Sequence, residues 1–254
     1  MAEQLETTMF DDAVRRLEDV VVDLQPGQRL PAERELAAEL GVSRLTVREV
    51  LKALAARGLL ELSQGRRALV CDPSSAVLSH FFAVSVRRDP RGMLELHEIR
   101  RSLEVLSATA AARSATRSGV GLVERALGQM ALAAEELDDA RAAGLETSSL
   151  LQTYITADVS FHATLAVASG NRLLSLLLES LSESLEETFA ESSRGHFDRG
   201  GSAGEVVETH RAVVEAARRR NPRAAADAMT RHLDEAAHDL RAAFRPSDPA
   251  GESR

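Results

Sequence analysis

The chain has 254 residues, which is enough for one large domain or for two smaller ones with separate cores. Apolar residues at 44% and charged residues at 28% are typical of a soluble globular protein, and the net charge of −8 excludes a protein that coats nucleic acid or anionic membranes non-specifically. One cysteine, an acidic start and no apolar run of about 20 residues predict a cytoplasmic protein without disulfides or a membrane span.

Residues 1–73 have the pattern of three short helices followed by a small hairpin. An apolar stripe predicts a helix over residues 10–24, and a second helix over 32–40 stops at Gly41. Ser43 is a suitable N-cap for a third helix that continues to about residue 57. Short apolar runs at 59–62 and 68–70 flank a polar turn and predict a two-stranded hairpin. This order of elements is that of a winged helix-turn-helix.

The third helix carries a basic stripe. Arg44, Arg48 and Lys52 follow one another at four-residue spacing, on the side away from the apolar face. Arginines on a helix behind a tight turn can reach guanine edges and phosphates in the major groove, and Ser43 and Thr46 stand near the helix start, where they can contact the same DNA. A solvated charged face is the alternative interpretation, and spacing alone leaves both open.

After a short helix and a linker at residues 74–92, long helical patterns continue almost to the end of the chain. We predict helices near 93–116, 119–143, 148–169, 171–193, 203–220 and 222–244, with a loop between Gly195 and Gly204. These segments predict an all-α bundle over residues 93–245, so the fold class is mainly α. Residues 246–254 are rich in Pro, Ser and Gly and predict a disordered tail.

Four residues of the helical half have side chains that can bind a metal ion. Asp158 and His162 project from one face of a helix, and His210 and His232 occupy similar apolar settings on two later helices. Three imidazoles and one carboxylate suit Zn²⁺, Ni²⁺, Mn²⁺ or Fe²⁺ better than Ca²⁺ or Mg²⁺. Each histidine taken alone is more often a hydrogen-bonded core residue, so spacing leaves the metal site open.

Two stretches near the N-terminus resemble a known family. PAERELA at residues 31–37 and GVSRLTVRE at 41–49 resemble the N-terminal domain of GntR-family transcription regulators, most of all the FadR branch. The resemblance covers about residues 10–70. It implies a winged helix-turn-helix whose DNA contacts come from Arg34, Ser43, Arg44, Thr46, Arg48, Gly65 and Arg66. One departure is Arg67, which stands where the family commonly has a second glycine in the wing.

The helical half resembles the FCD domain, the effector-binding partner of FadR-type winged helices. EIRRSLE at residues 98–104, DVSFH at 158–162 and SGN at 169–171 carry this resemblance, which covers about residues 74–244. It implies that a metal, with Zn²⁺ expected first, is held by Asp158, His162, His210 and His232. It also implies a small carboxylic acid effector, and we assign Arg100 and Asn171 to its binding. Without the resemblance, an ion pair of Arg100 with Glu104 one turn later is the simpler interpretation.

The sequence therefore predicts a ligand-responsive transcription regulator and not an enzyme. We expect a repressor that binds a palindromic operator in double-stranded DNA as a homodimer. One alternative is a metal-dependent enzyme fused to a DNA-binding module, with Glu208 or Glu235 as its general base. Another is a regulator whose metal is purely structural. His238 and Asp239 are interpreted as a solvated helix end.

Overall fold

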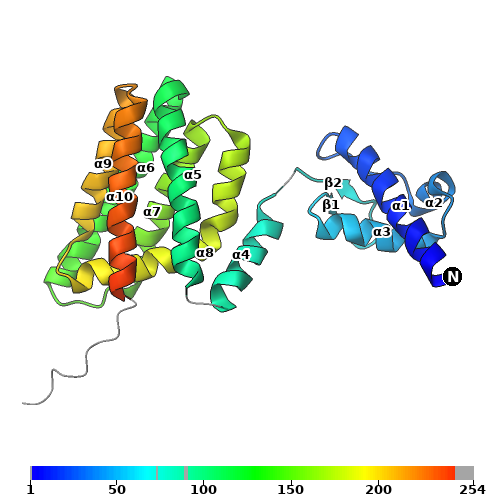
Figure 1. Cartoon of the computed structure of the whole chain (residues 1–254), viewed down its shortest axis with the longest axis horizontal. Helices are drawn as coiled ribbons and strands as arrows, with labels where there is room; N and C mark the ends of the chain where they lie inside the picture. The colour runs from blue at the N-terminus through cyan, green and yellow to red at the C-terminus, as the bar shows by residue number, and fades with distance from the viewer. Residues whose placement is uncertain (1, 73, 89–90, 244–254) are drawn as a thin grey trace, which may run out of the picture. The chain divides into compact units, whose positions relative to one another are not determined.

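The computed structural model describes residues 2–72, 74–88 and 91–243 (Figure 1). The chain divides into two compact units, Met1–Val77 and Leu78–Arg254. The predicted disordered tail at residues 246–254 lies outside the described residues. No helix in the described part of the chain combines the length and the apolar character needed to cross a membrane.

The N-terminal unit is a winged helix-turn-helix, as predicted. It consists of α1 (Ala2–Asp23), α2 (Glu33–Leu40), α3 (Arg44–Ala56) and the strands β1 (Leu60–Glu61) and β2 (Leu69–Val70). The two strands pair antiparallel, and α3 packs against both α1 and α2. Apolar residues of all these elements form one core, which includes Leu17, Val47 and Leu54. Helix α1 begins earlier than the predicted residue 10, because no helix-breaking residue precedes that position.

The C-terminal unit is all-α, which confirms the predicted fold class. Its helices are α4 (Ala76–Arg88), which starts just before the unit boundary, α5 (Gly92–Ser114), α6 (Arg117–Ala142), α7 (Ser148–Ala168), α8 (Arg172–Asp198), α9 (Ala203–Arg218) and α10 (Pro222–Ala243). Helices α5 and α10 run side by side, and α5 also contacts α7, α8 and α9 (Figure 1). This central position lets side chains of α5 reach the interior of the bundle.

Helix α8 corrects one prediction, because it continues through Gly195 to Asp198 instead of ending near residue 193. Gly195 lies where α8 meets the backbone of α10. A Cβ atom added there would stand 2.1 Å from the Asp239 carbonyl oxygen and 3.2 Å from the Ala243 nitrogen. The glycine is therefore a helix-packing residue, since only a residue without a side chain lets the two backbones approach this closely.

We predict that Gly195→Ala lowers the free energy of unfolding by about 1–3 kcal/mol, because the new methyl group overpacks the α8–α10 contact. Chemical denaturation of the full chain measures this change. Gly128→Ala in α6 is the matched control, since nothing lies within 4 Å of a Cβ at that position. The control should gain about 0.5–1 kcal/mol from helix propensity. Equal effects of the two substitutions would contradict the close approach.

Candidate DNA-binding, metal and effector sites

The predicted recognition helix α3 exposes a basic face. Ser43 caps the helix, since its Oγ accepts a hydrogen bond from the Thr46 N–H at 3.0 Å and lies 2.8 Å from the Thr46 hydroxyl. Arg44 and Arg48 are exposed on this face, and Arg48 Nε donates to the Glu33 carboxylate at 2.8 Å. Exposed guanidinium groups at the start of a capped helix are what insertion into the major groove requires.

A groove of about 620 Å³ is lined by α2, α3 and the turn between β1 and β2. Among its lining residues are predicted DNA contacts, namely Arg34, Arg44, Arg48, Gly65 and Arg66. Ser43 and Thr46, which form the N-terminal cap of α3, are not among the residues that line it. Gly65 has a φ of +71°, a conformation that favours glycine, whereas Arg67 has no positive φ. The hairpin therefore turns without the second glycine that the family commonly has.

The four predicted metal ligands meet inside the helical bundle. Asp158 and His162 come from α7, His210 from α9 and His232 from α10, and all four side chains are buried. Asp158 Oδ1 lies 3.3 Å from His162 Nε2 and 3.0 Å from His210 Nε2, and these two nitrogens are 3.1 Å apart. One ring nitrogen of each of the three histidines lies within 4.8 Å of the others. Three helices thus bring together residues that are far apart in the sequence.

Two of the imidazoles are oriented by hydrogen bonds of their Nδ1 atoms. His210 Nδ1 donates to the Val206 carbonyl oxygen at 2.8 Å. His232 Nδ1 donates to the Thr209 hydroxyl at 2.8 Å, because that hydroxyl gives its own proton to the Val206 carbonyl at 2.7 Å. With a hydrogen on each Nδ1, both Nε2 atoms carry a free lone pair, which is the arrangement of metal-binding histidines.

The third imidazole is oriented by a buried ion pair of α5. Arg100 and Glu104 are each only 1% exposed, and Arg100 Nε donates to Glu104 Oε1 at 2.7 Å. Glu104 Oε2 contacts His162 Nδ1, so the third Nδ1–H also has a fixed acceptor. Arg100 Nη2 donates to His162 Nε2 at 3.0 Å, and the guanidinium lies 4.0 Å from the centre of the Phe189 ring. The Arg100–Glu104 pair exists, but it is buried and linked to a predicted metal ligand.

Sequence reasoning missed the role of Glu104. Its spacing from Arg100 predicts an ion pair on the surface of one helix, and the contact with His162 depends on the packing of α5 against α7. The acidic residue at the end of the EIRRSLE segment was the available signal, since a carboxylate there lies one turn after Arg100.

The buried ligand atoms fit a divalent cation. Within the described residues, no hydrogen-bond partner reaches the buried His232 Nε2. Asp158 Oδ1 faces the Nε2 atoms of His162 and His210, at 3.3 and 3.0 Å. The Nε2 atoms of His162 and His210 place two lone pairs 3.1 Å apart, a contact that a cation between them relieves. Ligand atoms around an ion with bonds of about 2.1 Å stand about 3.0 Å apart at an angle of 90° and about 3.4 Å apart at the tetrahedral angle. The donor set of three nitrogens and one oxygen suits Zn²⁺ and related transition-metal ions.

Contacts within the cluster set its charges. Burial opposes ionisation of Glu104, but the Arg100 guanidinium lowers the pKa of Glu104 to about 2. Burial likewise opposes ionisation of Asp158, but without an ion the positive charge of a protonated His210 beside the carboxylate holds the pKa of Asp158 well below its usual range. Burial and then the neighbouring His210 hold the pKa of His232 well below its usual range, so this imidazole is neutral at pH 7. Both carboxylates are therefore charged, and His232 keeps a lone pair for an ion.

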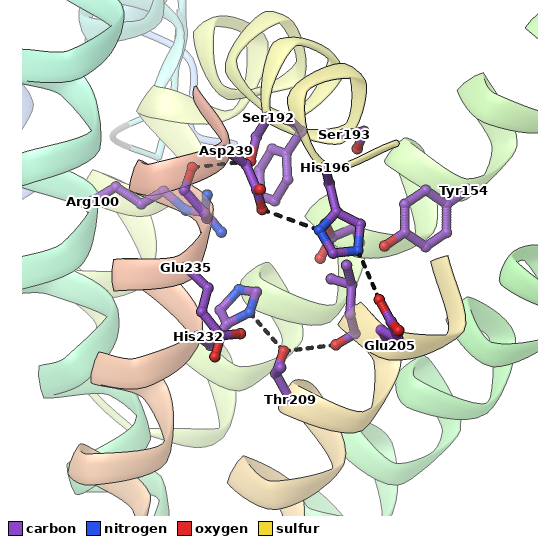
Figure 2. Close-up of a pocket in the computed structure, with 14 residues that line it drawn as sticks. Arg100, Tyr154, Ser192, Ser193, His196, Glu205, Thr209, His232, Glu235 and Asp239 are labelled. Carbon is purple, nitrogen blue, oxygen red and sulfur yellow. Dashed lines mark hydrogen bonds and ion pairs between the residues drawn. The ribbon is translucent and has the colours of Figure 1, made fainter. Parts of the chain in front are cut away.

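A cavity of about 160 Å³ lies directly beside these residues. Its inner end is lined by Arg100, Asp158 and His232. Figure 2 shows Arg100 and His232 on one side and His196 and Glu205 on the other. The rest of the lining comes from α7, α8, α9 and α10 and consists of Tyr154, Phe189, Ser192, Ser193, Val206, Thr209, Glu235, Ala236 and Asp239. A small molecule in this cavity can touch the candidate metal ligands and Arg100 together.

Asn171, which we assigned to effector binding, does not line this cavity. Its Oδ1 accepts a hydrogen bond from the Leu174 N–H at 3.2 Å and caps α8, and its side chain is exposed. The SGN segment therefore starts a helix, and its position gives no support to a role in effector binding.

Asp239 was interpreted from the sequence as part of a solvated helix end, and for this residue the interpretation is wrong. The side chain lines the cavity and is only 5% exposed. Asp239 Oδ2 lies 3.4 Å from His196 Nδ1, and its other carboxylate oxygen contacts Arg199. The hydrogen bond that His196 donates to the Asp239 carboxylate raises the pKa of His196. His238, in contrast, is exposed as predicted, and its Nδ1 accepts a hydrogen bond from Arg199 at 2.8 Å.

Two known domain families match the chain. The FCD domain matches residues 95–235, more than half of the chain, and the family of bacterial regulatory proteins called gntR matches residues 11–70. The chain belongs to the GntR family and has an FCD domain. This confirms the resemblance seen in the sequence, and it makes the protein a DNA-binding transcription regulator rather than an enzyme.

Other regulators resemble this GntR protein over most of their length. The Glc operon transcriptional activator of Escherichia coli K12 is 29% identical, over 85% of this chain and 83% of the relative. The transcriptional regulator LutR of Bacillus subtilis is 30% identical, over 83% and 90%. The transcriptional repressor NanR of Citrobacter rodentium is 30% identical, over 82% and 75%. The solved structure of Streptococcus agalactiae GntR has a TM-score of 0.65 at 27% identity, over 90% of this chain and 99% of that one.

We predict that Glu104→Gln weakens the binding of Zn²⁺ by about 10- to 100-fold, as expected for the loss of a residue that orients a metal-binding histidine. A carboxylate accepts hydrogen bonds on two oxygens, from Arg100 and from His162, whereas an amide has one acceptor oxygen. Competition with a chromophoric chelator measures the affinity. Glu98→Gln is the matched control, since Glu98 is exposed on the same helix. An unchanged affinity in a folded Glu104→Gln protein would contradict this role.

Proposed function

We propose that this GntR regulator belongs to the FadR subfamily and that its helical unit binds a divalent metal ion together with a small organic acid. The observation that carries the proposal is the convergence of three imidazole nitrogens and one carboxylate oxygen beside a cavity. The ion would be held by Asp158, His162, His210 and His232, with Zn²⁺ as the first choice and Ni²⁺, Mn²⁺ or Fe²⁺ as alternatives. When bound, the ion supplies an electrophilic centre that attracts the carboxylate of the effector.

Arg100 is the proposed second contact of the effector. Its Nη2 donates a hydrogen bond to His162 Nε2. This hydrogen bond occupies the lone pair with which His162 would bind a metal ion. Once His162 serves as a ligand, Arg100 loses this acceptor while its Nε remains on Glu104. The released Nη2 then faces the cavity that Arg100 lines, where a carboxylate can accept its hydrogen bonds. A cavity in this position favours an effector-binding metal over a purely structural one.

The enzyme alternative loses its candidate general bases. Glu208 pairs with Arg211 and does not line the cavity. Glu235 lines the cavity, but the similar proteins named above carry the names of regulators. We therefore assign the site to ligand sensing and not to turnover.

We propose that two copies of the chain read a palindromic operator. Leu173 and Leu177, one turn apart on α8, are 70% and 41% exposed and offer apolar surface that a second copy can cover. A two-fold dimer places two recognition helices about 34 Å apart, which is one turn of DNA. The effector would act by binding better to one of two orientations of the winged helices.

We propose repression in the cytoplasm as the mode of action, because release of an operator on effector binding needs no contact with the transcription machinery. The similar proteins include one named as a repressor and one named as an activator.

Arg44→Ala and Arg48→Ala are each predicted to weaken operator binding by about 1–3 kcal/mol, because each removes a guanidinium from the proposed base-reading face. The operator is first selected from random duplexes with the wild-type protein, and fluorescence anisotropy then measures affinity. Arg15→Ala is the matched control, since Arg15 is exposed on α1 outside the groove. Full operator affinity in both α3 variants would contradict the assignment of this helix.

Arg100→Lys is predicted to weaken effector binding by about tenfold or more while the metal-loaded protein stays folded. Lysine keeps a cation for Glu104 but lacks the forked donors that hold a carboxylate, and a charge-assisted hydrogen bond contributes about 1.5–3 kcal/mol. A thermal-shift screen of small carboxylates on Zn²⁺-loaded protein finds the effector, and calorimetry compares the variants. Arg101→Lys is the control on the exposed neighbour. An acid that binds Arg100→Lys as tightly as wild type would place the effector elsewhere.

A further inference from the structure

Leu45, in the first turn of α3, exposes an apolar side chain on the outward face of that helix. The residue is 69% exposed. At about 100° per residue, its side chain lies about 170° from the mean direction of the buried side chains of the helix. These buried residues are Val47, Val50, Leu51 and Leu54. Leu45 therefore points almost directly away from the core of the N-terminal unit.

The cap of α3 fixes where the first turn begins. Ser43 Oγ accepts a hydrogen bond from the Thr46 N–H at 3.0 Å, so the helix starts at Arg44 and Leu45 is its second residue. Residues near the N-terminus of a recognition helix are the ones that contact base edges in the major groove. Leu45 thus has the position of a base-reading residue, although it has no polar group.

Charged side chains that can contact DNA share this outward face. Arg48 and Lys52 are both exposed, and both lie within about 60° of Leu45 around the helix axis. Arg44 precedes Leu45 in the chain and is exposed as well. If the two arginines reach bases or phosphates in the major groove, the same docking brings Leu45 against the base edges between them.

The chemistry of leucine restricts what it can recognise there. Its side chain neither donates nor accepts hydrogen bonds, so it can read a base edge only by apolar contact. In the major groove, thymine presents a C5-methyl group, whereas the edges of guanine, adenine and cytosine present hydrogen-bond donors and acceptors. Burial of leucine against the methyl group is favourable, and burial of unpaired polar groups against leucine is costly. An apolar side chain at this position therefore favours thymine.

We propose that Leu45 is a specificity-determining residue that contacts the C5-methyl group of one thymine in each half-site of the operator. The inference rests on the proposed function, because α3 must be the helix that enters the major groove. It adds a base preference that the arginines do not supply, since guanidinium groups recognise guanine and phosphates.

Deoxyuridine isolates the methyl group, because it pairs with adenine as thymidine does and lacks only the C5-methyl. The operator is selected from random duplexes with the full-length wild-type protein, and each thymine is then replaced in turn by deoxyuridine in both half-sites. Fluorescence anisotropy at one fixed salt concentration measures the affinity. We expect one thymine position at which the replacement weakens wild-type binding by about fourfold for each half-site, the effect of one buried methyl group.

Leu45→Ala should weaken binding to the thymine operator and should show no further loss when that thymine is replaced by deoxyuridine. Because the contact is apolar, the slope of affinity against salt concentration should remain that of the wild type. Val22→Ala is the matched control, since Val22 is also 69% exposed and lies on α1. The control should keep the wild-type loss on deoxyuridine.

The outcomes separate the inference from the proposed function. An operator in which no thymine methyl affects wild-type binding overturns the role of Leu45, and so does a Leu45→Ala protein that keeps the wild-type loss. If Arg44→Ala and Arg48→Ala weaken binding in the same experiment, the failure concerns Leu45 alone. If both arginine variants bind as tightly as the wild type, the assignment of α3 fails together with the inference.

Discussion

The candidate site depends on one constraint, which is that each of its three imidazoles has its Nδ1–H fixed on an acceptor of the protein. The acceptors are the Val206 carbonyl, the Thr209 hydroxyl and the Glu104 carboxylate. If any of these rings had its hydrogen on Nε2, the cluster would offer a donor where an ion needs a lone pair. The proposed metal site and the proposed effector contact both depend on this choice of tautomer.

Helix α5 connects the metal ligands to the cavity. Glu104 holds His162 with one oxygen and Arg100 with the other, so a change at the ion reaches the proposed effector contact through a single carboxylate. Because α5 also packs against α7, α8, α9 and α10, a shift of this helix is felt through most of the bundle. An effector shifts the equilibrium between two arrangements of these helices only if it binds one arrangement more tightly than the other.

Much of the fold and part of the site could be predicted from the sequence. Helical periodicity and caps predict the elements, and the motifs name His162, His210 and His232, which the structure brings together. The sequence predicts that Gly195 begins a loop, because it does not show that the backbone of α10 lies against this residue. The bridging role of Glu104 was missed for the same reason, since its second partner lies on another helix. Local spacing predicts contacts within a helix, and tertiary packing decides those between helices.

X-ray absorption at the zinc edge of the Zn²⁺-loaded chain tests the central claim most directly. The orientation of the three rings predicts a first shell of about three imidazole nitrogens with carboxylate oxygen, at about 2.0–2.2 Å. His232→Ala should lose one nitrogen from that shell and keep the others. A shell of oxygen atoms alone, or a spectrum that does not change in His232→Ala, would contradict the account.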